Sequence, residues 1–325
     1  MKIMLTGAGG PAAISVWKSL NNAHELFMAD MDPHAPGLYL VPPEQRLLLP
    51  RGDAPGFADA ALDACRARGI EALVSTVDAE LIALAKRRSD FEAAGVQLPL
   101  SPLPTLQMCR DKLALLTHLS TSVPVPAHAV LDAAPLRLDA ALPWFAKPRA
   151  GSGSRDLTRI DSEADLAALP RDGSLLVQEY LPGEEYSVDV YVRSDGQAVA
   201  AVPRERMKTD SGIAITARTV HVPEVIDAAV RAAQDAGIRG VANVQFRRAR
   251  DGVFRLLEIN PRFPGTLPLT AAAGVDIPAL MMAELQGQSL PDGLMPFEDR
   301  MVVRYLTEHL VEPGGFEALS RTSGP

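Results

Sequence analysis

Apolar positions in the first hundred residues fall into two kinds of stretch that alternate along the chain. Short apolar runs have the character of buried strands, and they cover residues 2–6, 25–30 and 71–76. Longer stretches have the spacing of amphipathic helices, and they cover residues 11–20, 57–68 and 79–94. Strands that alternate with helices predict parallel βαβ units around an open twisted sheet. We therefore expect a Rossmann-like α/β domain over residues 1–98.

The pattern changes after residues 99–104, which carry three prolines and predict a linker. Helices are expected from about residue 104 to residue 119 and at residues 162–169 and 222–236. Many other apolar positions alternate with polar ones, as in antiparallel strands with one exposed face. Strands are expected at residues 127–131, 144–148, 175–193, 198–207, 211–220, 241–249 and 253–260. The second part of the chain therefore predicts an antiparallel α+β fold.

Composition narrows the class of protein. The chain has 325 residues, of which 47% are apolar and 22% charged, as is ordinary for a globular protein of two domains. Its net charge is −8 and no segment concentrates Lys and Arg, so we expect neither nucleic acid nor a membrane as a partner. Cys65 and Cys109 are expected on helices as buried residues, without a disulfide. No apolar run resembles a signal peptide or a membrane span, which predicts a cytoplasmic protein.

The segment GAGGPA at residues 7–12 raises a specific alternative. It fits the G-x-G-x-x-G/A turn of dinucleotide-binding folds, and Asp30 follows at the distance of a ribose-binding acid. This pattern favours an NAD(P)-dependent oxidoreductase. However, Pro11 also suits the first turn of any helix, and residues 31–33 do not continue as a ribose-binding segment. A second interpretation is that the turn faces a carboxylate substrate or simply closes the strand.

Two polar side chains near the end of a predicted strand form a candidate metal site. Glu258 and Asn260 point to the same face, whereas Ile259 points to the core. A carboxylate and an amide oxygen suit Mg²⁺, which takes phosphate oxygens as further ligands. Arg262 could hold a phosphate, and Gln245 on the preceding strand could face the same site. Taken singly, each residue is more typical of the exposed polar face of an antiparallel strand.

Two further segments suit an anionic nucleotide. Lys147 ends an apolar strand and precedes a glycine- and serine-rich loop at residues 151–154, which offers backbone N–H groups and hydroxyls to phosphate. The loop lacks the G-K-[ST] sequence of a P-loop. Residues 178–186 run from a strand into an acidic Pro-Gly turn that could bind adenine and ribose. Alone, the first segment is equally well explained as a surface linker, and the second is more typical of a solvated turn.

Together, these segments and the CRDK sequence at residues 109–112 resemble the ATP-grasp superfamily, especially the branch of the carbamoyl-phosphate synthetase large subunit and biotin carboxylase. The resemblance covers residues 105–285. It implies a Rossmann-like pre-ATP-grasp domain followed by an ATP-grasp domain of two α+β subdomains at residues 105–325. The lid subdomain would occupy about residues 120–182, and the C-terminal subdomain about residues 183–318.

The resemblance also implies a role for each candidate residue. The residues that would bind ATP are Lys112, Lys147, Ser152, Gly153, Ser154, Gln178, Glu179, Tyr180, Leu181 and Glu185, with Glu184 as the alternative to Glu185. The ligands of Mg²⁺ or Mn²⁺ would be Gln245, Glu258 and Asn260. Lys147 and Arg262 would be catalytic, with Arg262 steadying the transferring γ-phosphoryl group. Five cations that could reach substrate are not distinguished: Arg204, Arg206, Lys208, Arg218 and Arg304.

The implied activity is that of an ADP-forming carboxylate–amine ligase, which acts through an acyl phosphate on a small carboxylic or amino acid. A kinase that phosphorylates carbamate or another carboxylate is the alternative within the same fold, and a nucleotide-binding regulator is a third class. The substrates are expected near the tips of the N-terminal strands, around residues 9–10 and 78–80. The resemblance is also consistent with a homodimer.

Overall fold

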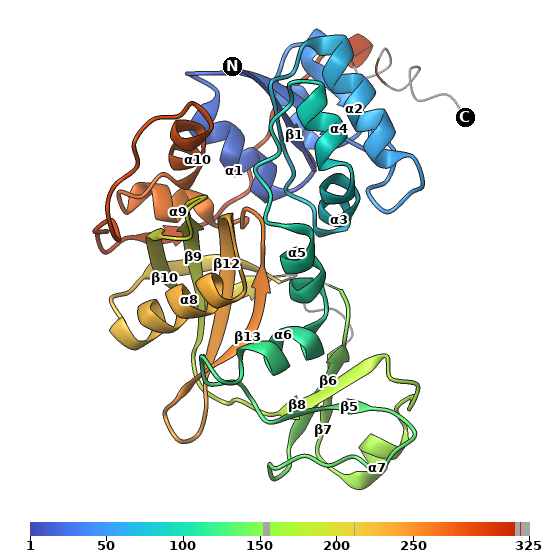
Figure 1. Ribbon diagram of the computed structural model, residues 1–325, viewed down its shortest axis with the longest axis vertical. Helices are drawn as coiled ribbons and strands as arrows, with labels where there is room; N and C mark the ends of the chain where they lie inside the picture. Colours follow the sequence, from blue (N-terminus) through green and yellow to red (C-terminus); the bar gives the residue numbers. More distant parts are fainter. Residues whose placement is uncertain (152–156, 211, 316–318, 320–325) are drawn as a thin grey trace.

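Three β-sheets organise the chain (Figure 1). The computed structural model describes residues 1–151, 157–210, 212–315 and 319. A parallel N-terminal sheet lies at one end of the molecule and a small lid sheet lies at the other, with the largest sheet between them (Figure 1). The predicted combination of an α/β part and an α+β part is therefore confirmed.

The N-terminal sheet consists of β1 (Lys2–Thr6), β2 (Glu25–Asp30), β3 (Arg46–Leu48) and β4 (Ala72–Val74). The strands are parallel in the order β3-β2-β1-β4. The helices of this region are α1 (Pro11–Leu20), α2 (Phe57–Arg68), α3 (Asp78–Lys86), α4 (Arg88–Ala93) and the 3₁₀ turns Pro36–Leu40 and Pro43–Gln45. The single helix expected at residues 79–94 was wrong, because the chain breaks at Arg87, where φ is −108° and ψ is 13°.

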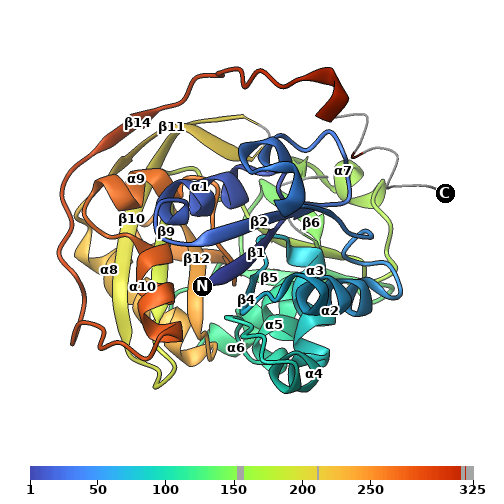
Figure 2. The ribbon, with the colours of Figure 1, turned by 90° about the horizontal axis from the view of Figure 1, so that it is seen from above.

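The largest sheet is antiparallel, as predicted. It consists of β9 (Glu185–Val192), β10 (Ala198–Asp210), β11 (Ile213–Thr219), β12 (Gly240–Arg248), β13 (Phe254–Asn260) and β14 (Met301–Val303). The order of the strands is β13-β12-β9-β10-β11-β14. The helix α8 (Pro223–Asp235) packs on one face through its buried alanines. The helices α9 (Leu267–Ala272) and α10 (Ile277–Leu285) cover the other face (Figure 2).

The lid sheet is small and has a core of its own. Its strands are β5 (His128–Leu131), β6 (Trp144–Pro148), β7 (Thr158–Ile160) and β8 (Leu175–Glu179), and α7 (Glu163–Ala167) packs beside them. The strand order is β5-β8-β6-β7. The buried residues of this core are Leu131, Ala146, Ile160 and Val177.

Two short helices link the N-terminal sheet to the lid sheet. They are α5 (Leu103–Arg110) and α6 (Lys112–Leu119), and they replace the single helix expected at residues 104–119. Asp111 interrupts the helix with φ −101° and ψ 103°, and its carboxylate accepts hydrogen bonds from the backbone N–H groups of Leu113 and Ala114. The prediction of one helix was therefore wrong, because Asp111 acts as the N-cap of a new helix.

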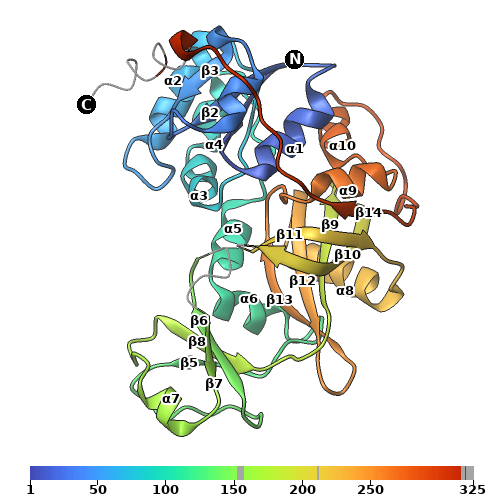
Figure 3. The ribbon, with the colours of Figure 1, turned by 180° about the vertical axis from the view of Figure 1, so that it is seen from behind.

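The N-terminal sheet and the largest sheet share one hydrophobic core. The helix α1 lies beside α9 and α10 (Figure 2), and buried residues of these helices pack together with Tyr191 and Val202 of the largest sheet. The segment after β14 crosses the back of the molecule toward the N-terminal sheet (Figure 3). Cys65 and Cys109 are both buried and unpaired on helices, as predicted. Within the described residues, no helix is both long and apolar enough to span a membrane.

Candidate active site

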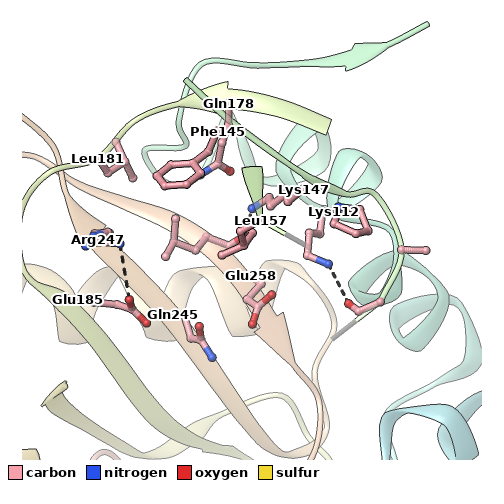
Figure 4. A pocket seen from close by; sticks show the side chains of 14 residues that line it. Lys112, Phe145, Lys147, Leu157, Gln178, Leu181, Glu185, Gln245, Arg247 and Glu258 are labelled. Carbon is pink, nitrogen blue, oxygen red and sulfur yellow. Dashed lines mark hydrogen bonds and ion pairs between the residues drawn. The ribbon is translucent and has the colours of Figure 1, made fainter. Parts of the chain in front are cut away.

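A cavity of about 370 Å³ lies between the lid sheet and the largest sheet (Figure 4). We call it the lid cavity. It is lined by Lys112, Phe145, Lys147, Pro148, Ala150, Gly151, Leu157, Gln178, Leu181, Glu185, Gln245, Arg247, Leu257 and Glu258. The structure thus brings most of the predicted nucleotide-binding residues to one place, although they come from segments far apart in the sequence.

One end of the lid cavity carries two ammonium groups and one carboxylate. Lys147, at the end of β6, is 7% exposed and its Nζ donates a hydrogen bond to the carbonyl oxygen of Leu257 at 3.4 Å. Lys112 Nζ donates to the carbonyl oxygen of Gly151 at 2.8 Å. Burial lowers the pKa of Lys147 to about 8, while the charge of Glu258 acts in the opposite direction. Two buried cations side by side suit a multiply charged phosphate chain.

The other end of the lid cavity is apolar and contains an amide without a partner. Phe145 and Leu181 face the cavity together with Gln178 (Figure 4). The Gln178 side chain is 7% exposed, and its Oε1 is buried with no hydrogen-bond partner in the described structure. Flat apolar walls and an unsatisfied polar atom fit a purine ring with an exocyclic amino group.

Two of the predicted nucleotide-binding residues do not line the lid cavity. Glu179 forms an ion pair with Arg255, with 3.1 Å between the oxygen and Nε, and also accepts a hydrogen bond from the backbone of Ala127. The Tyr180 ring packs against Phe145 at 5.5 Å between ring centroids and lies under the guanidinium of Arg159. Successive residues of a strand point to opposite faces, so Gln178 enters the cavity while Glu179 leaves it.

Glu185 lies at the rim of the lid cavity, where the ribose was expected. It forms ion pairs with Arg206 and with Arg247, the latter at 3.8 Å. Glu184 does not line the cavity and instead faces Arg248 at 3.9 Å. The placement therefore favours Glu185 over its neighbour. Ser152, Gly153 and Ser154 lie outside the described residues.

The predicted metal ligands lie on neighbouring strands. Gln245 of β12 is directly opposite Glu258 of β13, and Asn260 Nδ2 donates a hydrogen bond to Glu258 Oε1 at 3.0 Å. Among the described residues, no group of three His, Cys, Asp or Glu side chains is arranged to hold a metal. One carboxylate with two amides is a sparse, all-oxygen donor set. It fits Mg²⁺, which keeps waters and takes its remaining ligands from phosphate.

A second cavity, of about 720 Å³, lies between the N-terminal sheet and the largest sheet. We call it the central cavity. Gln245 lines both cavities, so the two adjoin at the predicted metal site. Asn260 and Arg262 line the central cavity and not the lid cavity. Arg262 Nε lies 2.9 Å from Asp78 Oδ2, which connects the largest sheet to the N-terminal helix α3.

The structure distinguishes the five cations that the sequence left open. Arg206 lines the central cavity. Arg204 is fully buried and bonded to Asp189 at 2.5 Å, with its Nε and Nη1 unpartnered among the described residues. Arg218 pairs with Glu205 at 2.7 Å, outside both cavities. Arg304 donates to the carbonyl oxygen of Gly265, and Lys208 lines neither cavity.

The glycine-rich turn does not offer its amides to a dinucleotide. The N–H of Gly9 donates to Asp30 Oδ2 at 2.7 Å, and the N–H of Gly10 donates to the carbonyl oxygen of Gly7 at 2.8 Å. The groups that would bind a pyrophosphate are therefore already used, and the Asp30 carboxylate would repel it. The turn lines the central cavity, and the interpretation that it faces a carboxylate substrate stays a prediction.

Arg247 and Leu257 of the lid cavity were not predicted. Arg247 follows Gln245 by two residues on β12, so the two share a face, and strand alternation could have identified it. Leu257 lines the cavity from β13, where it is the extra residue of a bulge opposite Gln245 and Phe246 of β12. A register shift of this kind leaves no signal in the sequence.

Comparison with known proteins agrees with this architecture. Residues 171–309 match the family described as ATP-grasp in the biosynthetic pathway with Ter operon, and residues 3–99 match the PylC-like N-terminal domain. The chain is 30% identical over 223 residues to the carbamoyl phosphate synthase large chain of Thermus thermophilus. The alignment covers 62% of this chain but only 21% of that protein, so the chain spans a small part of this curated relative.

Solved structures show the same fold at low sequence identity. Biotin carboxylase from Campylobacter jejuni superposes with a TM-score of 0.73 and 16% identity, over 89% of this chain and 72% of that chain. The L-amino acid ligase from Bacillus licheniformis superposes with a TM-score of 0.65 and 16% identity, over 88% of this chain and 74% of that chain.

Proposed function

We propose that this chain, whose residues 171–309 match an ATP-grasp family, is an ADP-forming ATP-grasp ligase that joins a small carboxylic or amino acid to an amine. The observation that carries the proposal is the lid cavity, which is lined by Lys112, Lys147 and Glu258 together with the apolar residues Phe145 and Leu181. The named activities of the relatives, including ligation of amino acids, are consistent with it.

The residues of the two cavities divide the proposed reaction between them. Lys112 and Lys147 would hold the phosphate chain of ATP, and Gln178 would bind the exocyclic amino group of adenine. Arg262, in the central cavity, would meet the γ-phosphoryl group as it passes to the substrate carboxylate. The resulting acyl phosphate reacts with an amine and releases phosphate. Such a transfer depends on positioning and on fixed charges rather than on covalent participation of the protein.

A divalent cation would complete the phosphate site. Glu258, Asn260 and Gln245 are the residues that would hold Mg²⁺, which neutralises charge on the β- and γ-phosphates when it is bound. By the same resemblance we expect a homodimer, which sedimentation of the purified protein tests.

The activity is tested by measuring ADP release across a panel of carboxylates and amines. We expect ADP and phosphate to form only when a carboxylate is present, and Glu258→Ala to lower turnover by at least about 1,000-fold without unfolding the protein. Glu184→Ala, which alters a residue outside the cavity, is the matched control. Formation of AMP and pyrophosphate would contradict the proposal. A stable acyl phosphate that needs no amine would instead favour the carboxylate kinase.

A further inference from the structure

The central cavity contains a buried carboxylate without a cationic partner. Glu80, in the first turn of α3, lines this cavity and is 6% exposed. Its Oε2 accepts hydrogen bonds from the hydroxyls of Thr6 and Ser75, the latter at 2.7 Å. Among the described residues, no Lys, Arg or His forms an ion pair with Glu80, and no donor reaches its Oε1. A buried charge without such a partner is unfavourable, so its position at a cavity indicates a ligand.

The surroundings of Glu80 add negative charge and fix its side chain. Asp30 lies on the same wall and raises the pKa of Glu80 in the same direction as burial, which has the larger effect and brings the pKa to about 7. Both Asp30 oxygens are used by backbone N–H groups, those of Gly9 and Asp32. A Cβ atom on Gly52 would lie 2.5 Å from Glu80 Cγ, so this loop packs closely against the methylene part of the Glu80 side chain and limits its movement.

The cations of the cavity do not compensate this charge. Arg206 is paired with Glu185, and Arg262 is paired with Asp78. Arg51 is paired with Asp53 at 2.6 Å. The cavity therefore has a wall with an excess of carboxylate on the side of the N-terminal sheet, facing a wall with the proposed phosphoryl-transfer residues on the side of the largest sheet.

We propose that the carboxylate substrate is an amino acid and that Glu80 binds its ammonium group. The inference rests on the proposed function and deepens it. Glu80, Asn260 and Arg262 line the same cavity, so a ligand bound at Glu80 lies in the space that Asn260 and Arg262 also face. An amino acid held at Glu80 by its ammonium can extend its carboxylate toward Asn260 and Arg262, where the γ-phosphoryl group would arrive.

Hydroxylamine provides a direct test, because it attacks an acyl phosphate to give a hydroxamate and phosphate whatever the natural amine is. The probes are pairs of acids with and without an amino group, such as L-alanine with propionate and L-lysine with hexanoate. We expect hydroxamate only from amino acids. Glu80→Gln should lower kcat/KM for the preferred amino acid about 100-fold and leave KM for ATP unchanged. Glu80→Asp, which keeps the charge, should recover part of the loss.

Asp63→Asn is the matched control, because Asp63 is an exposed acid on α2 that lines neither cavity. The inference is overturned if the wild type reacts with acids that lack an amino group as well as with amino acids, or if Glu80→Gln keeps the wild-type kcat/KM and preference for amino acids. If no acid supports ADP release, the proposed function fails separately. In that case the melting temperature is measured with ADP and each of the same acids. The inference is supported if amino acids raise the melting temperature of the wild type but not that of Glu80→Gln. It is overturned if the shift is the same in the two proteins or for the two kinds of acid, or if no acid causes a shift.

Discussion

At the scale of single residues, Gln178 gives the clearest indication of what the lid cavity binds. Its buried Oε1 has no partner in the described structure, and an unsatisfied buried acceptor costs about 1–3 kcal/mol. We expect Gln178→Leu to raise KM for ATP about tenfold while the unliganded protein becomes no less stable, because the substitution removes that penalty together with the ligand contact. Nucleotide titration and thermal melts measure the two effects. Unchanged affinity for ATP would exclude Gln178 from the adenine site.

Glu80 makes the stability of the folded state depend on pH. Its pKa in the folded protein is about 7, above the usual 4.5, because burial disfavours the charged form. The folded state therefore holds a proton that the unfolded state releases between these values, so stability falls as the pH rises from about 4.5 to 7. Glu80→Gln removes this effect and should be about 3 kcal/mol more stable than the wild type at pH 8, with the difference vanishing near pH 4. Urea unfolding at both pH values measures it, and an equal difference at the two would contradict the assignment.

At the scale of elements, Asp111 connects a helix boundary to the nucleotide site. Its carboxylate caps α6 and also accepts two hydrogen bonds from Arg149, at 2.8 and 2.6 Å. Lys112, the next residue, donates its backbone N–H to Arg149 and its Nζ to Gly151. The cap thus fixes the position of a lysine in the lid cavity relative to β6.

We expect Asp111→Ala to lower the free energy of unfolding by about 1–2 kcal/mol and to raise KM for ATP, because the cap is lost and Lys112 is no longer held. Asp111→Asn keeps an oxygen for the cap but removes the negative charge that faces Arg149. Its free energy of unfolding should lie between those of Asp111→Ala and the wild type. Arg149 also holds the pKa of Asp111 below its usual value. The stability that the Asp111–Arg149 pair adds to the folded state is therefore present above about pH 4 and is lost on acidification. Equal stability of all three proteins would contradict the interpretation.

Most of the longer elements of the fold followed from the sequence, whereas their interruptions, the helices α9 and α10 and the three-residue strands β3, β7 and β14 did not. The apolar runs of β1 and β2 and the alternation in β9 and β12 identify strands, since a strand has only two faces to satisfy. The break at Arg87 carries no helix-breaking residue, and Arg87 instead pairs with Asp59 and Asp90. Such contacts come from tertiary structure. Asp111, in contrast, is a typical N-cap residue, and its sequence signal was available.

The candidate site divides in the same way. Four residues were predicted together and lie together in the lid cavity: Lys147, Gln178, Gln245 and Glu258. Each belongs to a strand, and the alternation of apolar and polar positions along a strand indicates which side chains share a face. The sequence placed the substrate near residues 9–10 and 78–80, but it did not predict that Asn260 and Arg262 line a different cavity from Glu258. This separation arises because Asn260 and Arg262 lie at and just after the end of β13, where the chain runs close to α3. Asp78 of α3 therefore contacts Arg262. That placement depends on how the N-terminal sheet packs, which local patterns do not encode.

At the scale of the whole molecule, the three sheets do not share one core. The N-terminal sheet and the largest sheet pack through α1, α9 and α10, whereas one face of the lid sheet has a small core of its own, with Leu131, Ala146, Ile160 and Val177 as the buried residues. The other face reaches the core of α6 and the largest sheet through Leu176. A small core gives a low free energy of local opening. The lid sheet also contributes Lys147 and Gln178 to the lid cavity, so the proposed nucleotide would contact the sheet that has this small core.

We therefore expect the backbone amides of β6 and β8 to exchange with deuterium faster than those of β1 and β12 in the free protein, because the lid can open without disturbing the shared core. Adding ADP and Mg²⁺ should slow exchange in β6 and β8 and leave β1 unchanged, since a ligand that contacts Lys147 and Gln178 binds only the closed lid. Gln178→Leu provides the matched control, because it keeps the lid core but weakens the ligand contact. Uniform protection across the three sheets, or a nucleotide effect confined to β1, would show instead that the lid and the N-terminal sheet open as one unit.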